Sequence, residues 1–546
     1  MRALLAKLSL FSFLISLLAS APLLAAERGA RFQNLDQMIE ALNLRPYFTS
    51  ANRPKRAVRV AIFDNGFKDA EKEIGRSLPR NTQIIPGPVP LEGEEDLHGF
   101  YMARILWSLL SLGGEDERYA PAEFRLYRTF GYSNFEAAIE DAIARKVDVI
   151  LYSQTWDYGG NFDGRGFINK LVNKALDKGI IWINSSGNTG STTYNGAIVD
   201  GRDGWLKLPG RNDSVEIRCP KTPLGKCPLR AVLSWNDFKD DVTQGSDKDL
   251  DFVLTDDTLN IVQASSLTQV KTAEEAKAPG SSQYPREIIT AELKPGVYFL
   301  RVKRKSENFT ARDAFRISVQ GDSLQMRNAD REESVLAPAD NARVISVGAS
   351  DTERSSRSLR LAKPELSADS LVSLSRTENF KGTSNTAAMV AAGAVIIKSL
   401  HPELTREGFL RNVSKNALSP AGRGLPLSQL GFRSTGPNCF ETLPEDSVPP
   451  YVDEALNLGG RLVKTNAGPK VFYPFDPLDM LPSIQRREAA DLIVMTENGP
   501  GVFNRSGLWK MPKGMIELVE LPKGTRLCPA AGTPTLPAFT KRFRLP

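Results

Sequence analysis

The sequence predicts an α/β protein built on a doubly wound parallel sheet, with an inserted β-sandwich domain and a C-terminal β-rich region. Three observations lead to this prediction. Strand and helix signals alternate over residues 57–200, short strand signals replace them at about residue 205, and the alternation resumes at Arg343. Strands separated by helices are typical of parallel sheets, whose functional sites lie beyond the carboxyl ends of the strands.

The elements of the α/β part follow from the spacing of its apolar residues. Buried, β-branched runs predict strands, and apolar residues at helical spacing predict helices. The expected strands are Ala57–Phe63, Val147–Tyr152, Gly179–Ile183 and Arg343–Ser350, and the expected helices follow His98 or cover Asn134–Arg145, Phe167–Asp177 and Ser384–Leu400.

The middle of the chain has a different pattern. Short alternating runs such as L-D-F-V-L-T and G-V-Y-F-L-R-V are separated by turn residues and contain no convincing helix, which predicts a β-sandwich. We therefore divide the chain into a signal peptide (1–26), an N-terminal segment (27–56), an α/β domain (57–204 and 334–415), an inserted β-sandwich (205–333), a Pro-, Gly- and Ser-rich linker (416–450) and a C-terminal β-rich domain (451–546).

The N-terminus has the pattern of a secretory signal. Arg2 and Lys7 precede an apolar run from Leu8 to Leu18, small residues follow, and cleavage is expected after Ala26. An uncleaved anchor is the alternative, which Pro22 and the serines of the run disfavour. We expect a secreted or periplasmic protein with no stable membrane insertion after cleavage.

The charge pattern argues against nucleic acid as a partner. The chain of 546 residues has a net charge of +6, from 70 basic and 64 acidic residues, and no basic cluster.

Four cysteines agree with export to an oxidising compartment. Sequence alone allows three connectivities, of which the nearest-neighbour one is our prediction. It joins Cys219 to Cys227 and Cys439 to Cys528.

Four polar residues stand where a doubly wound sheet brings loops together. Asp64 ends a strand before Asn65-Gly66, and His98 precedes Gly99 at the start of a helix. Asn188 lies in S-S-G-N-T-G after a strand, and Ser384 lies in G-T-S-N-T-A-A-M-V-A-A-G at a helix start. Histidine is the side chain best suited to accept a proton near neutral pH, and the chain has only two. The other, His401, is interpreted as a helix-terminal structural residue.

Taken together, these phrases resemble the subtilisin-like serine protease family (subtilases, peptidase S8). The family's D-[ST]-G, H-G-T-x-V-A, S-G-N-x-G and G-T-S-M-A-x-P-x-V-A-G motifs correspond to the phrases at Asp64, His98, Asn188 and Ser384. The resemblance implies that Ser384 attacks the substrate, His98 accepts its proton, Asp64 orients His98 and Asn188 stabilises the oxyanion. Loss of the oxyanion asparagine from a subtilisin lowers kcat by about 10²–10³-fold.

The chain departs from the family at several positions. Ala388 replaces the proline of the serine helix, and Asp369-Ser370 replaces Pro-Gly. Ser153, Gln154 and Thr155 stand where the family has S-L-G, the segment that pairs with substrate backbone, so we interpret them as substrate-binding. None of these changes removes a reacting atom.

The resemblance predicts a secreted serine endopeptidase that acts on protein or peptide substrates and requires no cofactor for catalysis. The alternative is an exported binding protein on a catalytically silent subtilase fold. The acidic phrase from Trp235 to Asp257 could hold a structural calcium ion, and a solvated acidic loop is the alternative explanation.

Overall fold

The computed structural model describes residues 56–414 except 92, 112–120, 224, 322 and 374–378. It also describes a few positions before residue 56 and short strands between residues 432 and 527. The chain divides into two compact units, Met1–Ser356 with Ala368–Asn416 and Arg357–Ser367 with Ala417–Pro546.

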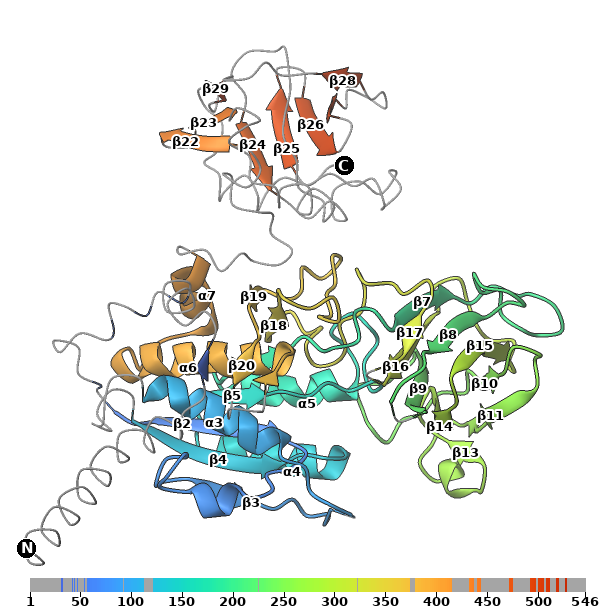
Figure 1. Ribbon diagram of the computed structural model, residues 1–546, viewed down its shortest axis with the longest axis horizontal. Coiled ribbons are helices and arrows are strands. Elements are labelled where there is room, and N and C mark those ends of the chain that lie inside the picture. Colours follow the sequence, from blue (N-terminus) through green and yellow to red (C-terminus); the bar gives the residue numbers. More distant parts are fainter. Residues whose placement is uncertain are drawn as a thin grey trace, which may run out of the picture. The chain divides into compact units, whose positions relative to one another are not determined.

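A parallel sheet forms the centre of the first unit (Figure 1). Six of its strands follow the order β18-β6-β5-β2-β4-β3, and neighbouring strands in this order are parallel. They are β2 (Val58–Asp64), β3 (Gln83–Ile85), β4 (Ala122–Arg128), β5 (Val149–Tyr152), β6 (Ile181–Ser185) and β18 (Ile345–Ala349). The predicted fold class is therefore confirmed.

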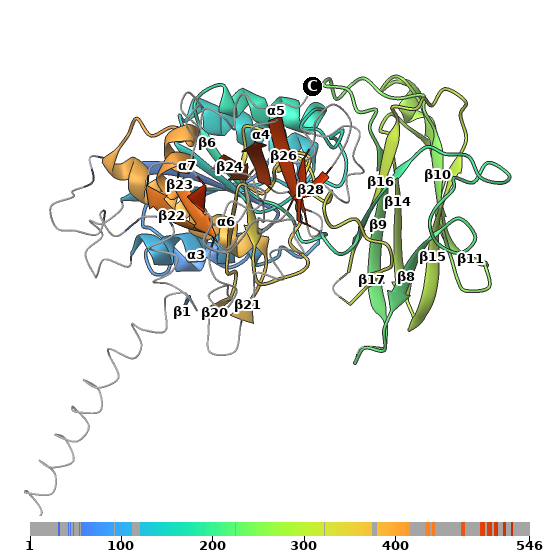
Figure 2. The same cartoon turned by 90° about the horizontal axis from the view of Figure 1, so that it is seen from above.

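Helices cover both faces of this sheet (Figure 2). Helices α4 and α5 pack together on one face, and α3 and α6 pack together on the other. Their bounds are α3 (His98–Leu110), α4 (Tyr132–Ala144), α5 (Phe167–Leu176) and α6 (Thr383–Leu400), and α7 (Arg406–Ser414) follows α6. This arrangement is the doubly wound pattern expected from the sequence.

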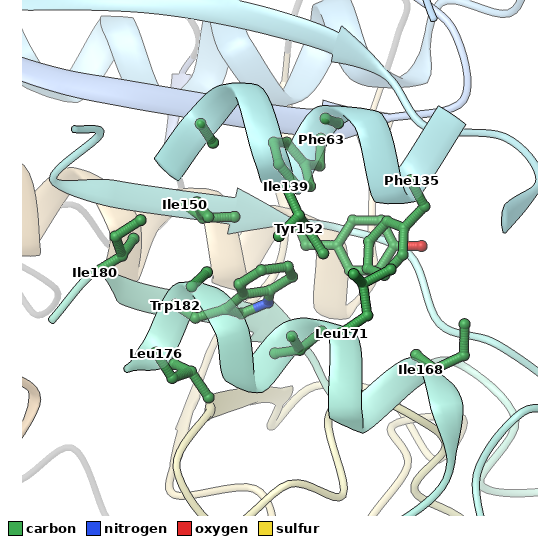
Figure 3. Close-up of a cluster of buried hydrophobic side chains, with 14 of the residues drawn as sticks. Phe63, Phe135, Ile139, Ile150, Tyr152, Ile168, Leu171, Leu176, Ile180 and Trp182 are labelled. Carbon is green, nitrogen blue, oxygen red and sulfur yellow. The ribbon is translucent and has the colours of Figure 1, made fainter. Parts of the chain in front are cut away.

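An aromatic cluster fills the space between the sheet and helices α4 and α5 (Figure 3). The Phe63 ring centroid lies 5.7 Å from that of Trp182 and 6.2 Å from that of Phe135. Successive side chains of a strand point to opposite faces, so Asp64, the next residue, points to the face covered by α3 and α6. This alternation turns Asp64 toward the helix that begins with His98.

Helix α6 is buried along its whole length. Its small residues allow close packing against α3 and against β5, β6 and β18. No helix among the described residues is both long and apolar enough to cross a membrane.

The inserted region folds into two antiparallel sheets, with strand orders β11-β10-β15-β8-β17 and β14-β9-β16-β7. Their bounds are β7 (Thr193–Ala197), β8 (Val215–Cys219), β9 (Cys227–Trp235), β10 (Leu250–Thr255), β11 (Ile261–Ser265), β14 (Arg286–Leu293), β15 (Gly296–Arg304), β16 (Ala314–Gln320) and β17 (Gln325–Met326). The predicted sandwich is therefore present. Strand β7 precedes the predicted boundary at residue 205 and pairs with β16, and the domain boundaries themselves stay predictions.

The sandwich contains a fully buried carboxyl group, Glu287 on β14. Gln269 Nε2 and the Leu267 backbone N–H each donate to Glu287 Oε1 at 2.9 Å, and the Ser265 hydroxyl donates to Oε2. Burial nevertheless outweighs these bonds and raises the pKa of Glu287 to about 7.

Shorter elements complete the first unit. They are β1 (Arg31–Phe32), η2 (Ala70–Glu73), β12 (Thr268–Gln269), η3 (Glu275–Lys277), β13 (Ser281–Ser282), β20 (Val372–Ser373) and β21 (Asn379–Phe380), while β19 (Leu366–Ala368) spans the division between the units.

The second unit contains two small antiparallel sheets, with strand orders β22-β23-β29 and β24-β25-β26-β27-β28. The strands are β22 (Phe432–Gly436), β23 (Cys439–Thr442), β24 (Val471–Pro474), β25 (Leu492–Thr496), β26 (Gly499–Asn504), β27 (Gly507–Lys510), β28 (Glu517–Val519) and β29 (Arg526–Leu527). They agree with the predicted β-rich C-terminal region.

Candidate active site

Asp64 and His98 form a hydrogen-bonded pair between a strand and a helix. Asp64 is the last residue of β2 and is fully buried, and His98 is the first residue of α3. His98 Nδ1 lies 2.8 Å from Asp64 Oδ2. The other carboxylate oxygen, Oδ1, accepts the Asn65 backbone N–H at 2.8 Å. The pair has the geometry of a general base and the carboxylate that orients it.

Glycines allow the strand end and the helix start to approach each other. The Gly99 backbone N–H donates to the Gly66 carbonyl oxygen at 3.0 Å. A Cβ at Gly99 would lie 2.5 Å from that oxygen and 2.6 Å from Asp64 Cβ. A larger residue at this position would therefore push His98 away from Asp64, which explains the glycine after His98.

Two carboxylates control the proton affinity of His98. Burial lowers its pKa, whereas the charge and hydrogen bond of Asp64 and the charge of Asp96 raise it, and the net effect is a raised pKa. Asp96 lies close because its Oδ1 accepts the His98 backbone N–H at 3.0 Å. The imidazole keeps a side-chain exposure of 35% and so stays open to a substrate.

Ser384 occupies the N-terminal turn of α6. Its hydroxyl donates to the Ser153 carbonyl oxygen at 3.2 Å, and no hydrogen bond joins it to His98 among the described residues. Gly382, two residues before Ser384, has a φ of 146°, a conformation that L-residues rarely adopt. The N-terminus of this 18-residue helix carries a partial positive charge beside the Ser384 side chain.

Asn188 is held in one orientation by Thr383. Its Oδ1 accepts the Thr383 backbone N–H at 3.1 Å and the Thr383 hydroxyl at 3.2 Å. The backbone N–H can only donate, so this contact assigns the oxygen of the amide and leaves Nδ2 as a donor. Asn188 is exposed and can present that donor to a ligand.

These residues surround one cavity of about 340 Å³. Its wall combines His98, Asn188 and Ser384 with apolar side chains and two further polar residues. The remaining lining residues are Leu97, Tyr101, Met102, Phe380, Lys381, Gly382 and Asn385. A ligand in this cavity would contact the imidazole, the hydroxyl and the amide together.

The segment after β5 connects the site to the inserted sandwich. The Trp156 backbone N–H donates to the Ala337 carbonyl oxygen at 2.7 Å. Asp157 is buried and accepts hydrogen bonds from the Arg230 guanidinium and from Gln320 Nε2, the latter at 3.0 Å to Oδ2. The substrate-binding role predicted for Ser153, Gln154 and Thr155 stays a prediction.

The sequence interpretation did not foresee where the Gln154 side chain lies. Its Nε2 donates to Asp64 Oδ1 at 3.1 Å and lies 3.3 Å from His98 Nδ1. The one available signal was a glutamine at the position where the family has leucine.

A second unforeseen network supports the turn before Ser384. Ser370, which replaces the glycine of the family's Pro-Gly, accepts the Gly382 backbone N–H on its hydroxyl at 3.0 Å. Asp351 Oδ1 accepts the same hydroxyl at 2.7 Å, and Asn385 Nδ2 donates to the Ser370 carbonyl oxygen at 2.8 Å. The departure from the family pattern therefore supplies hydrogen bonds to the loop that carries the hydroxyl.

His401 lies away from this site, as expected. It follows α6 as its C-terminal cap residue, and its ring contacts Tyr47 edge-on with a centroid distance of 6.1 Å.

The cysteine and calcium predictions have different outcomes. The Cys219–Cys227 disulfide is present. Cys528 lies outside the described residues, so its pairing with Cys439 stays a prediction. The described residues contain no group of three His, Cys, Asp or Glu side chains that could hold a metal ion, and the calcium hypothesis remains untested. The predicted signal peptide also lies outside the described residues.

Comparison with protein families gives one match. Residues 312–432 match the Subtilase family (peptidase S8), and this segment contains Ser384 and helix α6. The resemblance inferred from the motifs is thereby confirmed, and the match supports a serine peptidase function. Comparison with curated proteins gave no match.

Several solved structures are similar to the chain at low identity. The CspB protease of Clostridium perfringens is 13% identical, with 73% of this chain and 93% of that chain covered and a TM-score of 0.40. MycP1, a serine protease of the type VII (ESX-1) secretion system, is 13% identical over 71% of this chain and 84% of its own, with a TM-score of 0.32. The nisin leader peptidase NisP of Lactococcus lactis is 14% identical over 69% and 86%, with a TM-score of 0.31.

Proposed function

Because residues 312–432 match the Subtilase family, we propose that this chain is a secreted serine endopeptidase that hydrolyses peptide bonds through Asp64, His98 and Ser384. One observation carries the proposal. His98 is hydrogen-bonded to a fully buried carboxylate at 2.8 Å and lines the same cavity as Ser384 and Asn188.

The chemistry follows from the proposed roles. Ser384 Oγ attacks the scissile carbonyl while His98 Nε2 accepts its proton, and Asp64 stabilises the resulting imidazolium. Asn188 Nδ2 and the Ser384 backbone N–H donate to the oxyanion. His98 then returns the proton to the leaving amine, and water hydrolyses the acyl-enzyme with His98 again acting as the base.

The resting position of Ser384 requires one movement before attack. Its hydroxyl donates to the Ser153 carbonyl oxygen at 3.2 Å and must rotate toward His98 Nε2. Catalytic hydrogen bonds are often long or misdirected without substrate, so this resting geometry agrees with the proposed role of Ser384.

The pH dependence has a definite sign. His98 accepts a proton only in its neutral form, so activity falls as the pH drops below its pKa. Because the carboxylates of Asp64 and Asp96 raise that pKa above the ordinary 6.5, the acidic limb of kcat/KM is expected above this value.

Export is part of the proposal and has independent support. The N-terminal charge and apolar pattern is that of a secretory signal. The Cys219–Cys227 disulfide is of the kind that persists in oxidising compartments. Protein or peptide substrates follow from the family match.

A fluorophosphonate probe tests the proposal directly. The probe is expected to label Ser384 in the full chain, and both Ser384→Ala and His98→Ala are expected to abolish labelling and proteolysis. The losses of activity caused by the two substitutions should not be additive, because the two residues act as a unit. Ser399→Ala in the same helix and His401→Ala at its end serve as controls, since neither residue lines the cavity.

The alternative function is an exported binding protein on a silent protease fold. A correctly folded wild-type chain that neither reacts with the probe nor cleaves peptides would establish that alternative. Labelling retained in Ser384→Ala would instead show that the nucleophile assignment is wrong.

A further inference from the structure

Gln154 occupies a position from which it touches both members of the Asp64–His98 pair. Its Nε2 lies 3.1 Å from Asp64 Oδ1 and 3.3 Å from His98 Nδ1. The subtilase pattern has leucine at this position, and a leucine side chain cannot donate a hydrogen bond. The contact is therefore a feature of this chain rather than of the motif.

The hydrogen bonds of Asp64 leave its carboxylate little freedom. Oδ2 lies 2.8 Å from His98 Nδ1, and Oδ1 accepts both the Asn65 backbone N–H and Gln154 Nε2. Two donors on Oδ1 fix the plane of the carboxylate and direct Oδ2 toward the imidazole. Removing Gln154 leaves one donor on Oδ1, so the carboxylate can turn more freely.

The short Nδ1···Oδ2 distance assigns the proton of neutral His98 to Nδ1. The Gln154 amide hydrogens then lie beside an N–H group, so they oppose positive charge on the ring. By donating to Oδ1, Gln154 also draws negative charge away from the oxygen that faces His98. Both effects make the imidazolium less favourable.

The backbone of Gln154 is held firmly enough for its side chain to act in this way. Its carbonyl oxygen accepts the Nδ2 of buried Asn184 at 3.0 Å, and Asn184 Oδ1 accepts Trp182 Nε1 at 3.0 Å. Three residues later, Asp157 is bonded to the inserted sandwich. A functional side chain supported on both sides keeps its geometry.

We propose that Gln154 is a positioning residue, whose amide orients the Asp64 carboxylate toward His98 and lies against the Nδ1 side of the imidazole. This inference rests on the proposed protease function for its catalytic consequence. The charged groups that face His98 are Asp64 and Asp96, and Lys381 lines the same cavity.

The test replaces Gln154 with the residue that the family has at this position. In a His401→Asn background His98 is the single histidine of the chain, so an NMR titration reports its pKa without ambiguity. Gln154→Leu is expected to raise the pKa of His98 by about half a unit to one unit. The acidic limb of the kcat/KM profile should move upward by the same amount, with KM changed less than about twofold.

Thr155→Gly is the matched comparison. It also restores the family's residue in the same segment, but it leaves both Gln154 contacts in place. It is expected to alter KM and to leave the pKa of His98 unchanged. If Gln154→Leu does not fold, Gln154→Met keeps a side chain of similar length without a hydrogen-bond donor to Asp64, and it is expected to raise the pKa of His98 in the same direction.

Two results would overturn the inference. One is a His98 pKa that is the same in Gln154→Leu as in the parent or lower, and the other is an effect of Gln154→Leu on KM alone. Failure of the proposed function is distinguishable, because the NMR titration reports on Gln154 even in a chain that does not react with the fluorophosphonate probe.

Discussion

Asn188→Asp is the substitution that most directly examines the proposed oxyanion site. Asn188→Ala would be ambiguous, because Asn188 Oδ1 accepts two donors of Thr383, which is fully buried. Leaving such donors without an acceptor costs about 1–3 kcal/mol each in stability. Aspartate keeps an oxygen in place for Thr383 and removes the Nδ2 donor, so Asn188→Asp is expected to lower catalytic activity without lowering stability.

The expected loss can be estimated from the geometry. With Oδ1 fixed by Thr383, Nδ2 is the Asn188 group left to donate to the oxyanion, beside the Ser384 backbone N–H. Removal of one such donor lowers kcat by about 10²–10³-fold, or ~2.7–4 kcal/mol. The carboxylate of Asp adds repulsion toward the developing negative charge, so the loss should reach or exceed this range. KM should change little, because the donor acts mainly in the transition state.

The assay is kcat and KM for a chromogenic peptide, together with the thermal unfolding temperature. Asn81→Asp adds the same charge at an exposed residue before β3 and should leave kcat unchanged. A kcat that falls less than about tenfold in folded Asn188→Asp would show that Asn188 does not stabilise the oxyanion.

Three further predictions concern the inserted sandwich. Arg230→Met removes the positively charged partner of buried Asp157. Because the Arg230 side chain is 35% exposed, we expect a modest loss of ~1–3 kcal/mol in the free energy of urea unfolding, together with a lower kcat/KM. Burial raises the pKa of Glu287 from 4.5 to about 7. Between these two pH values the unfolded chain has lost the Glu287 proton and the native state still holds it, so the stability of the native state falls as the pH rises. Glu287→Gln should remove that loss, on the order of 3 kcal/mol, in melts compared from pH 4 to 8, and an unchanged pH profile would refute the reasoning. Replacing Cys219 and Cys227 by serine opens a loop with a sequence separation of 8 and should lower the free energy of unfolding by about 2.5 kcal/mol. Finding both cysteines as free thiols in the exported wild-type protein would contradict the oxidising location.

The sequence predicted the strands with continuous apolar runs well and missed strands without such runs. Strands β2, β5 and β6 are buried on both faces, so their continuous apolar runs were visible. Strand β4, between β2 and β3, was missed because its run A-E-F-R-L-Y-R alternates apolar and charged residues and lacks the continuous apolar run expected of a strand buried on both faces. Strand β7, T-Y-N-G-A, has no apolar pattern, and it becomes recognisable only through its pairing with β16. An edge strand is determined mainly by its partner, which a single sequence does not reveal.

The residues of the candidate site could be picked out in the sequence because their constraints are local. Gly99 has to follow His98, and Gly382 has to precede Ser384, since the backbone there approaches other groups closely or adopts a φ of 146°. Such requirements leave short motifs in the sequence. The contacts that support these residues leave no short motif, because they join distant parts of the chain. Gln154, for example, is 90 positions from Asp64.

The same reasoning gives the inserted sandwich a physical connection to the site. Asp157 bonds to Arg230 and Gln320, which lie 73 and 163 residues further along the chain. Its backbone is three residues from Gln154, so a shift of the sandwich strands β9 and β16 would reach the Asp64–His98 pair through this segment. Buried ion pairs hold a geometry because breaking one leaves an uncompensated charge. The insertion is therefore expected to act as a fixed support for the segment that carries Gln154, and Arg230→Met should change the pH profile of kcat/KM as well as stability. An Arg230→Met protein with lower stability but an unaltered pH profile would limit the sandwich to a stabilising role.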